Sequence, residues 1–194
     1  GTMTDIMWFV YSAAYLTVAC IMLILAKKFF DLFTPYSLDA ELTTKDNPAA
    51  GILLGGYLVG VAAILCGVFA GDTTEPTFAI FLSELGPVAG YGCLGIVLLF
   101  IAGIINDKAI LHSFSNTVEI ITRRNCAVSL IMAGGYIGSG IIIAAGLITS
   151  FDILSSILSF IYAQTALVGF CLLYQKFTKY DDQKEIGEGK NAAA

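Results

Sequence analysis

The stretch NPAAGILLGGYLVG occupies residues 47–60, and a closely similar stretch, NCAVSLIMAGGYIG, occupies residues 125–138. Aligned without gaps, the two stretches match at four pairs of positions: Asn47 with Asn125, Ala49 with Ala127, Gly56 with Gly134, and Gly60 with Gly138. Each stretch opens an apolar run without charged residues, and an Asn followed by small residues is a favourable start for a helix. The two stretches therefore predict a helical membrane protein with an internal repeat.

Five runs of about 20 or more residues contain no Asp, Glu, Lys, Arg or His, and they cover residues 6–26, 48–70, 86–105, 126–150 and 153–175. At a rise of 1.5 Å per residue, each run can cross a hydrocarbon core of about 30 Å. The composition agrees, because 57% of the residues are hydrophobic, 13% are charged and the mean hydropathy is +0.83. We predict an all-α membrane protein with five transmembrane helices that contacts the lipid bilayer directly.

An aromatic residue precedes each connector asparagine by eleven residues; the pairs are Tyr36 and Asn47, Phe114 and Asn125, and Tyr180 and Asn191. The repeating unit is a helix, a connector and a second, glycine-rich helix. We expect the first repeat in residues 1–70, the second in 71–150, and the first helix and connector of an incomplete third in 151–194. Asn191 and the alanines after it are then the cap and first turn of a further helix, or Ala192–Ala194 come from a cloning linker.

All ten Lys and Arg residues fall in the connectors after the first, third and fifth runs. The other two connectors carry only acidic residues, namely Asp72, Glu75, Glu84 and Asp152. Because Lys and Arg favour the cytoplasmic side, we expect connectors 27–47, 106–125 and 176–194 to be cytoplasmic and the N-terminus to lie outside. The net charge of −5 averages a basic and an acidic face, and it gives no reason to expect a nucleic-acid partner.

The asparagines and glycines have candidate roles in packing or in lining a path. Asn47, Asn125 and Asn191 are expected to cap helices, and they would also fit the lining of a cytoplasmic vestibule. Gly56 and Gly60, and likewise Gly134 and Gly138, follow one helix face, where small residues allow close packing of helices in lipid. The alternative for these glycines is a pore lined by exposed backbone.

The fifth apolar run has the most polar interior, with Ser155, Ser159, Tyr162 and Gln164 as its candidate polar face. Gln164 needs a hydrogen-bond partner in the membrane, either on another helix or in a water-filled path. We expect a second copy of the chain to supply that partner, which would make the protein a homo-oligomer with this helix at the interface.

Patterns for catalysis or for metal binding are weak in this sequence. The five cysteines occur singly, His112 and Glu119 fall in a cytoplasmic connector, and the apolar runs contain no charge. The sequence GYGCLG at residues 90–95 resembles a glycine-rich nucleotide-binding loop. It lies inside an apolar run, however, and no strand precedes it. We therefore expect no enzyme activity, no metal site and no cofactor.

The two asparagine-led stretches resemble the domain-of-unknown-function family 350, the YjfL-like bacterial inner-membrane proteins. Asn47, Ala49 and Ala50 match its Asn-x-Ala-Ala helix start, and Asn125 and Ala127 keep that pattern, whereas Val128 departs from it. The resemblance covers nearly the whole chain. It implies tandem two-helix units and a multi-pass location in the bacterial inner membrane, and it implies no activity.

Two functions fit these features. The repeats, glycine faces and polar fifth helix favour a passive channel or transporter-like bundle for a small solute or ion. The absence of charge within the apolar runs favours the alternative, a non-catalytic membrane scaffold whose basic connectors dock a cytoplasmic or membrane partner.

Overall fold

The computed structural model describes residues 2–70, 77–149 and 152–192, and every regular element within these ranges is a helix. In chain order the elements are α1 (Thr2–Phe33), α2 (Leu38–Thr43), α3 (Pro48–Phe69), α4 (Phe78–Ala109), the π-helical turn η1 (Val118–Thr122), α5 (Cys126–Thr149), α6 (Ile153–Phe177) and α7 (Asp182–Gly187). Five of them, α1, α3, α4, α5 and α6, are long and apolar enough to cross a membrane. The prediction of an all-α membrane protein with five transmembrane helices is confirmed.

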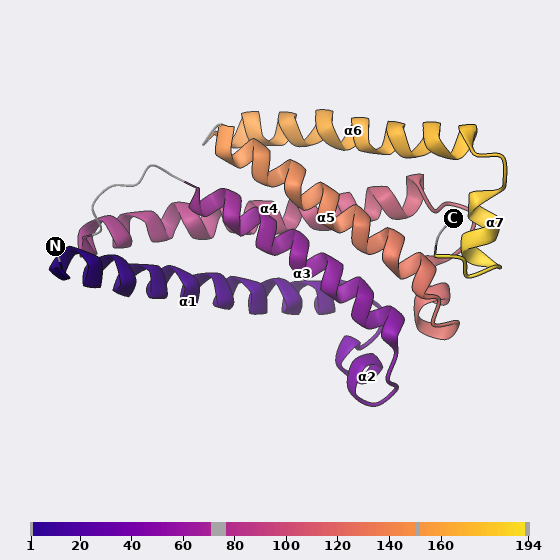
Figure 1. The fold of residues 1–194 in the computed structure, drawn as a ribbon, viewed down its shortest axis with the longest axis horizontal. Coiled ribbons are helices and arrows are strands. Elements are labelled where there is room, and N and C mark those ends of the chain that lie inside the picture. Colours follow the sequence, from indigo (N-terminus) through magenta and orange to yellow (C-terminus); the bar gives the residue numbers. More distant parts are fainter. Residues whose placement is uncertain (1, 71–76, 150–151, 193–194) are drawn as a thin grey trace.

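The short elements α2, η1 and α7 gather at one end of the bundle, which we call the connector end (Figure 1). Helices α3 and α5 start there and run away from it, whereas α1, α4 and α6 run toward it. Consequently α3 and α5 lie parallel to each other, and the connectors that lead into α3, into α5 and out of α6 all lie at the connector end.

Two helices extend beyond the apolar runs that predict them. Helix α1 continues to Phe33, so that Lys27 and Lys28 lie on the helix rather than after it. Helix α4 begins at Phe78, where the Thr77 hydroxyl accepts from the Ile80 N–H. The prediction that Glu84 lies in the preceding connector is therefore wrong, because a single carboxylate does not end a helix and that of Glu84 accepts a hydrogen bond from Tyr15 of α1. Asp72 and Glu75 lie outside the described residues.

The centre of the bundle is the close contact between α3 and α5. Gly56 lies against Ala133, Gly60 against the backbone of Tyr136, and Gly67 against Ala144. A Cβ atom at Gly60 would lie 2.6 Å from the Tyr136 carbonyl oxygen, and one at Gly67 would lie 2.8 Å from the Ala144 Cα. These distances leave no room for a side chain, so the approach of the two helices depends on glycine.

The other long helices pack around this pair. On the α1 side, Phe30, Tyr57 and Tyr136 form an aromatic cluster with ring centroids 4.6–6.0 Å apart, and the Tyr57 hydroxyl donates to the Ala26 carbonyl. Helix α4 packs against both α3 and α5, and α6 lies along α5. Helices α1 and α6 bury the smallest shares of their spans, which leaves most of their surface available to lipid.

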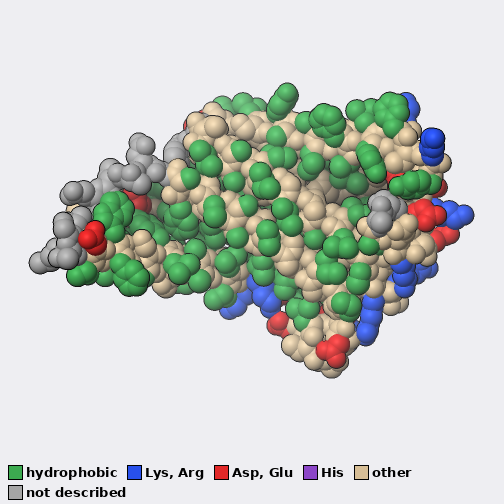
Figure 2. All heavy atoms as spheres, viewed as in Figure 1, with side chains coloured by type: hydrophobic (Ala, Val, Ile, Leu, Met, Phe, Trp, Pro, Cys, Tyr) green, Lys and Arg blue, Asp and Glu red, His purple; other side chains and the backbone are tan. Residues whose placement is uncertain are grey.

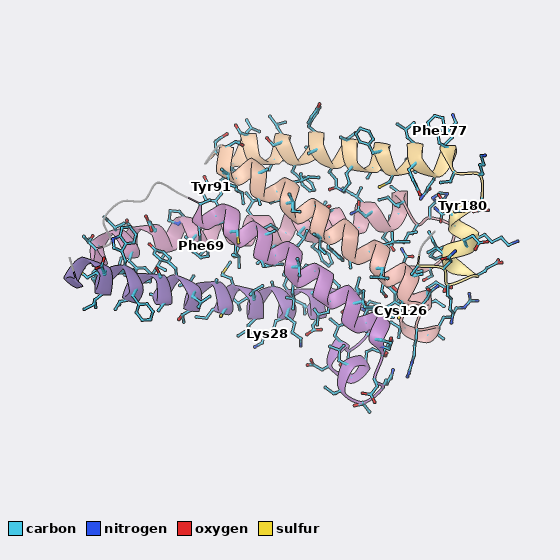
Figure 3. All side chains as sticks on the ribbon, in the orientation of Figure 1. Lys28, Phe69, Tyr91, Cys126, Phe177 and Tyr180 are labelled. Atoms are coloured by element: carbon cyan, nitrogen blue, oxygen red, sulfur yellow. The ribbon has the colours of Figure 1, made fainter. Side chains whose placement is uncertain are left out.

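Charge is concentrated at the connector end. Figure 2 shows the Lys and Arg side chains around α2, α7 and the neighbouring helix ends, with acidic side chains among them and hydrophobic side chains over the spans between the ends. Figure 3 shows Lys28 on α1, Cys126 at the start of α5, and Phe177 and Tyr180 on either side of the turn into α7. The connector end is thus a polar, ordered cap on an apolar bundle.

Candidate functional site

The first two connectors share a hydrogen-bonded loop between a buried Glu and a buried Asn. In the first, the Asn47 side-chain amide donates to Glu41 Oε2 (3.0 Å), and the Asn47 backbone N–H donates to the Glu41 carbonyl (2.9 Å). In the second, Asn125 makes the same two bonds to Glu119, at 3.1 Å and 2.9 Å. We call each loop a Glu–Asn clasp.

A basic residue completes each of these two clasps from the solvent side. Lys45 lies 2.6 Å from Glu41 Oε1, and Arg123 lies 2.9 Å from Glu119 Oε1. The two glutamates are 2% and 3% exposed, so their charges are shielded from water and depend on these partners. The third connector repeats the backbone part, because the Asn191 N–H donates to the Glu185 carbonyl at 3.0 Å.

The residue before each Asn has a left-handed backbone. Asp46, Arg124 and Lys190 have φ values of 47°, 52° and 51°, and they are the non-glycine residues with positive φ in the described chain. This conformation costs about 1–2 kcal/mol for most residues. Its recurrence at the same place indicates that the clasp imposes the backbone turn that leads into the following helix.

The asparagines also cap the helices that follow them. Asn47 Oδ1 accepts from the Ala49 and Ala50 N–H groups at 3.1 Å and 3.4 Å, and Asn125 Oδ1 accepts from the Ala127 N–H at 3.1 Å. Asn47 and Asn125 are 2% and 0% exposed, so the structure places neither on an open vestibule. Asn191 lies four residues beyond Gly187, the last residue of α7, and is exposed.

Each buried Asn also bonds to the next connector along the chain. The Asn47 side-chain amide donates to the Ile120 carbonyl in η1 (3.0 Å), which is the residue after Glu119. The Asn125 amide donates to the Ile186 carbonyl in α7 (2.9 Å), which is the residue after Glu185. These inter-connector bonds join the three connectors into one surface. The repeated Glu six residues before each Asn is the sequence signal that could have revealed it.

Charge and burial shift two pKa values in the first connector. The hydrogen bond from Asn47 and the ion pair with Lys45 lower the pKa of Glu41, against the opposing effect of burial. Burial, with a smaller contribution from the Glu41 and Asp31 charges, raises the pKa of Tyr36 to about 12. Glu41 is therefore held as a carboxylate with both oxygens occupied.

A hollow of about 490 Å³ opens at the connector end, between the second and third connectors. Both signs of charge contribute to its wall, and the polar lining includes Ser113, Ser115, Glu119, Arg123, Gln183 and Lys184. The hollow makes the surface of the joined connectors concave at this point.

A second polar group lies inside the bundle, where α4, α5 and α6 meet. Ser139 donates to Gln164 Oε1 at 2.9 Å, and Gln164 Nε2 donates to Asn106 Oδ1 at 2.7 Å. Asn106 Nδ2 lies 3.5 Å from Ser139 Oγ, and all three side chains are buried. We call this group the polar triad. Its members satisfy one another across three helices, as polar groups in lipid require.

The triad corrects the prediction for the polar face of the fifth span. Gln164 finds its partners on α4 and α5 of its own chain, so the partner expected from a second copy is not required. Tyr162 points outward with 80% of its surface exposed, and Ser159 is also exposed. Ser155 bonds to the carboxylate of Asp152, the residue that caps α6. The four residues therefore do not form one polar face.

The glycine stripe of α5 also differs from its prediction. Gly134 is exposed and has no atom within 4 Å of a Cβ placed on it, and Gly138 is half-buried with Leu167 at 4.0 Å. Helix α5 contacts α3 through another face, which carries Ala133, Gly140 and Ala144. Gly134 and Gly138 therefore make no close helix contact within the described chain, whereas Gly56 and Gly60 lie in the α3–α5 contact.

At the end opposite the connectors, Tyr15 of α1 donates to the carboxylate of Glu84 on α4. Phe69 and Phe81 pack around Tyr15, with ring centroids 5.7 Å and 5.1 Å away. Among the described residues, no group of three or more His, Cys, Asp or Glu side chains could hold a metal ion. The cysteines in these ranges are unpaired.

A family model described as Domain of Unknown Function (DUF350) matches residues 4–147 of the chain. The matched region runs from α1 to the end of α5 and includes the first two clasps and two members of the polar triad. No curated protein and no solved structure matches the chain.

Proposed function

Because the chain belongs to the DUF350 family, a family of unknown function, we propose its role from its own geometry: it is a non-catalytic membrane scaffold that docks a cytoplasmic partner on its joined connectors. The observation that carries this proposal is the pair of inter-connector bonds, Asn47 to Ile120 and Asn125 to Ile186. They fix three polar loops in one arrangement before any partner arrives, and preorganisation lowers the entropy cost of binding.

The charges of the connector end fit this role. The two buried glutamates already have partners on both oxygens, so they support the loops and are not available as proton acceptors. Lys45 and Arg123 are about half exposed, and their ion pairs with the buried Glu41 and Glu119 hold them in place. Basic and acidic side chains therefore occupy fixed positions on the connector surface. Such a surface suits a folded protein partner whose charges are complementary to it.

We propose that the connector end faces the cytoplasm of a bacterial inner membrane and that the N-terminus lies outside. The support is the charge distribution: all ten Lys and Arg residues lie toward this end, on the connectors or on the ends of the helices that enter them.

Site-specific photocrosslinking in cells tests the scaffold. A photoreactive residue at Ser115 or Lys179, both exposed at the connector end, should form an adduct with one discrete partner. The same residue at Thr77, at the opposite end, is the matched control and should form none. In an Asn47→Ala background the connectors lose their bond to η1, so the Ser115 adduct should weaken while the protein remains inserted. An equal yield of the Ser115 adduct with and without Asn47→Ala would contradict the proposal.

A second candidate is a passive path for a small neutral solute, which the polar triad favours because it places amide and hydroxyl groups inside the bundle. Flux into liposomes that contain the purified protein separates the two candidates. If the triad lines a path, transport of a small neutral solute should occur and should change in Asn106→Leu. Solute flux that depends on Asn106 would favour the path over the scaffold.

A further inference from the structure

The hollow at the connector end lies between two connectors that are joined in the same way as the pair before them. Asn47 bonds to the residue after Glu119, and Asn125 bonds to the residue after Glu185. The chain therefore contains two equivalent junctions: the first junction, between the first and second connectors, and the second junction, between the second and third. The hollow of about 490 Å³ belongs to the second junction.

The later connector of each junction contributes different side chains at equivalent positions. Counted back from Asn125 and Asn191, Val118 corresponds to Lys184, Ile121 to Gly187, and Thr122 to Glu188. Ile121 is half-buried and packs against the core, whereas Gly187 has no side chain, and a Cβ there would lie 2.9 Å from the Phe114 ring. Because the first two connectors join without charge at these positions, the fold of a junction does not require the lysine and the glutamate of the second.

Two cations in the wall of the hollow can bind an anionic group. Arg123 makes one side-chain hydrogen bond in the described chain, to Glu119, and its guanidinium retains other N–H donors. Lys184 is exposed, and within the described ranges its ammonium forms no ion pair. The two cations come from different connectors, so a carboxylate that both bind would contact the second and the third connector at once.

The same wall has acceptors for a cationic N–H group. Asp181 and Glu188 line the hollow, and neither forms an ion pair in the part of the chain that the structure describes. Gln183 also lines it. The Gln183 Nε2 atom donates to the Ile110 carbonyl, and its buried Oε1 atom has no hydrogen-bond partner among the described residues. A buried acceptor without a partner is rare in folded proteins, and a ligand with an N–H donor would satisfy it.

We propose that the hollow binds a small zwitterion with an apolar body, with the chemistry of a free amino acid that has a large apolar side chain. The carboxylate of the ligand binds the two cations, its ammonium binds the acceptors of the third connector, and its apolar part lies on Phe114 and Val118. An anion or a cation alone would meet like charge on one side of the wall, whereas a zwitterion meets opposite charge on both. The volume of the hollow lies within the range of about 300–1,000 Å³ that is typical of small-molecule pockets.

This site goes beyond the scaffold proposal, because a small molecule in the hollow requires no protein partner. Purified protein alone is sufficient to test it, whereas the photocrosslinks of the scaffold proposal are measured in cells. Failure of one proposal therefore leaves the other unaffected.

The probe is L-phenylalanine, and its binding to the purified protein in lipid nanodiscs is measured by isothermal titration calorimetry. Phenylacetate and phenethylamine are the matched control ligands, since each keeps the ring and lacks one of the two charges. We expect each control ligand to bind about tenfold more weakly or worse, because each loses one set of charge-assisted hydrogen bonds. Absence of phenylalanine binding overturns the proposal. A control ligand that binds as tightly as phenylalanine overturns it as well, because the site would then recognise a single charge.

Substitutions then test whether the ligand lies in the hollow. Lys184→Gln and Glu188→Gln should each weaken phenylalanine binding by about tenfold. Both should keep the unfolding temperature of the wild type, since these exposed side chains form no ion pair within the described chain. Lys179→Gln is the matched control and should leave binding unchanged, because Lys179 is an exposed lysine of the same connector outside the residues that line the hollow. Binding that survives both substitutions in the hollow, or that Lys179→Gln weakens equally, overturns the assignment.

Discussion

Asn125 uses every polar atom of its side chain. Its oxygen caps α5, and its nitrogen donates to Glu119 and to the carbonyls of Ile186 and Gly187. Asn47 does the same in the first connector: its oxygen caps α3, and its nitrogen donates to Glu41 and to the Ile120 carbonyl. Capping alone could be done by Asp or Ser, whereas only an amide provides both an acceptor and two donors at this position.

Because the Asn125 side chain both accepts and donates, we expect Asn125→Asp to be less stable than Asn125→Ala, although Asp is the better helix cap. Asn125→Asp keeps a good helix cap, but it puts a second carboxylate against Glu119 and removes the donors to α7. We expect it to lower the free energy of unfolding in detergent by about 3–5 kcal/mol, as for a buried charge without a partner. Asn125→Ala loses the cap as well, yet it should cost less, about 1–3 kcal/mol. Equal stability of the Asp variant and the wild type would mean that the cap is the main contribution.

The lowered pKa of Glu41 predicts an acid-dependent loss of stability. A carboxylate whose pKa is lower in the folded state stabilises the fold above its ordinary pKa of about 4.3, and it loses that contribution as the pH falls through the lowered value. As the pH falls below about 5, the thermal unfolding temperature should therefore decrease more steeply for the wild type than for Glu41→Gln. Parallel pH profiles of the two proteins would show that Glu41 has no such role.

The capping role of the asparagines could be predicted from sequence, because Pro48 after Asn47 and small residues in both starts are local signals. The clasps and the inter-connector bonds were missed. Asn47 and Ile120 are 73 residues apart, and nothing local indicates that one bonds to the other. The sequence shows only that a Glu recurs six residues before each of these asparagines. Its burial results from the packing of the connectors against one another.

At the scale of the helices, the predicted glycine stripe lies in a helix contact on α3 but has no such contact on α5 within the described chain. Matching glycines in two helices suggested matching contacts. However, α3 and α5 are parallel and meet with different faces: the Gly56 face of α3 contacts the Ala133 face of α5. The Gly56 face is therefore covered by Ala133, and the equivalent Gly134 face is left outside. Which face of a helix makes the contact depends on the position of the neighbouring helix as well as on the glycine stripe.

Two glycines of α3, Gly60 and Gly55, provide a matched test of that contact. Gly60→Ala should destabilise the protein in detergent by about 1–3 kcal/mol, because its Cβ would lie 2.6 Å from the Tyr136 carbonyl oxygen and the two helices would have to separate. Gly55→Ala meets no atom within 4 Å and should be neutral or stabilising by up to about 1 kcal/mol. Chemical unfolding of both variants measures the difference. Similar losses would indicate an effect of helix flexibility and not of packing.

At the scale of the molecule, the five spans followed from run length and from the placement of charge. Their exact ends did not, because α1 and α4 continue through charged residues such as Lys27 and Glu84. The polar triad also escaped prediction as a unit. Gln164 was recognised as needing a partner, but Asn106 and Ser139 come from two other helices, and the arrangement of those helices decides which groups meet.

The orientation can be checked by labelling single cysteines in intact cells that lack the native cysteines. Because the Lys and Arg residues concentrate at the connector end, a cysteine at Ser115 should stay unlabelled by an impermeant reagent until the cells are opened. A cysteine at Thr77, exposed at the opposite end, should be labelled at once. Labelling of position 115 but not of position 77 would reverse the assignment.

The parallel contact between α3 and α5 has a consequence for the order of synthesis. Ile120 is made 73 residues after Asn47, and at about 5–20 residues per second this takes roughly 4–15 s. During that interval α3 is already complete, while its glycine face and the Asn47 amide still await their partners. The α3 glycine face and the Asn47 amide therefore remain without these partners during synthesis, and slower decoding of the segment between α3 and η1 would lengthen that interval.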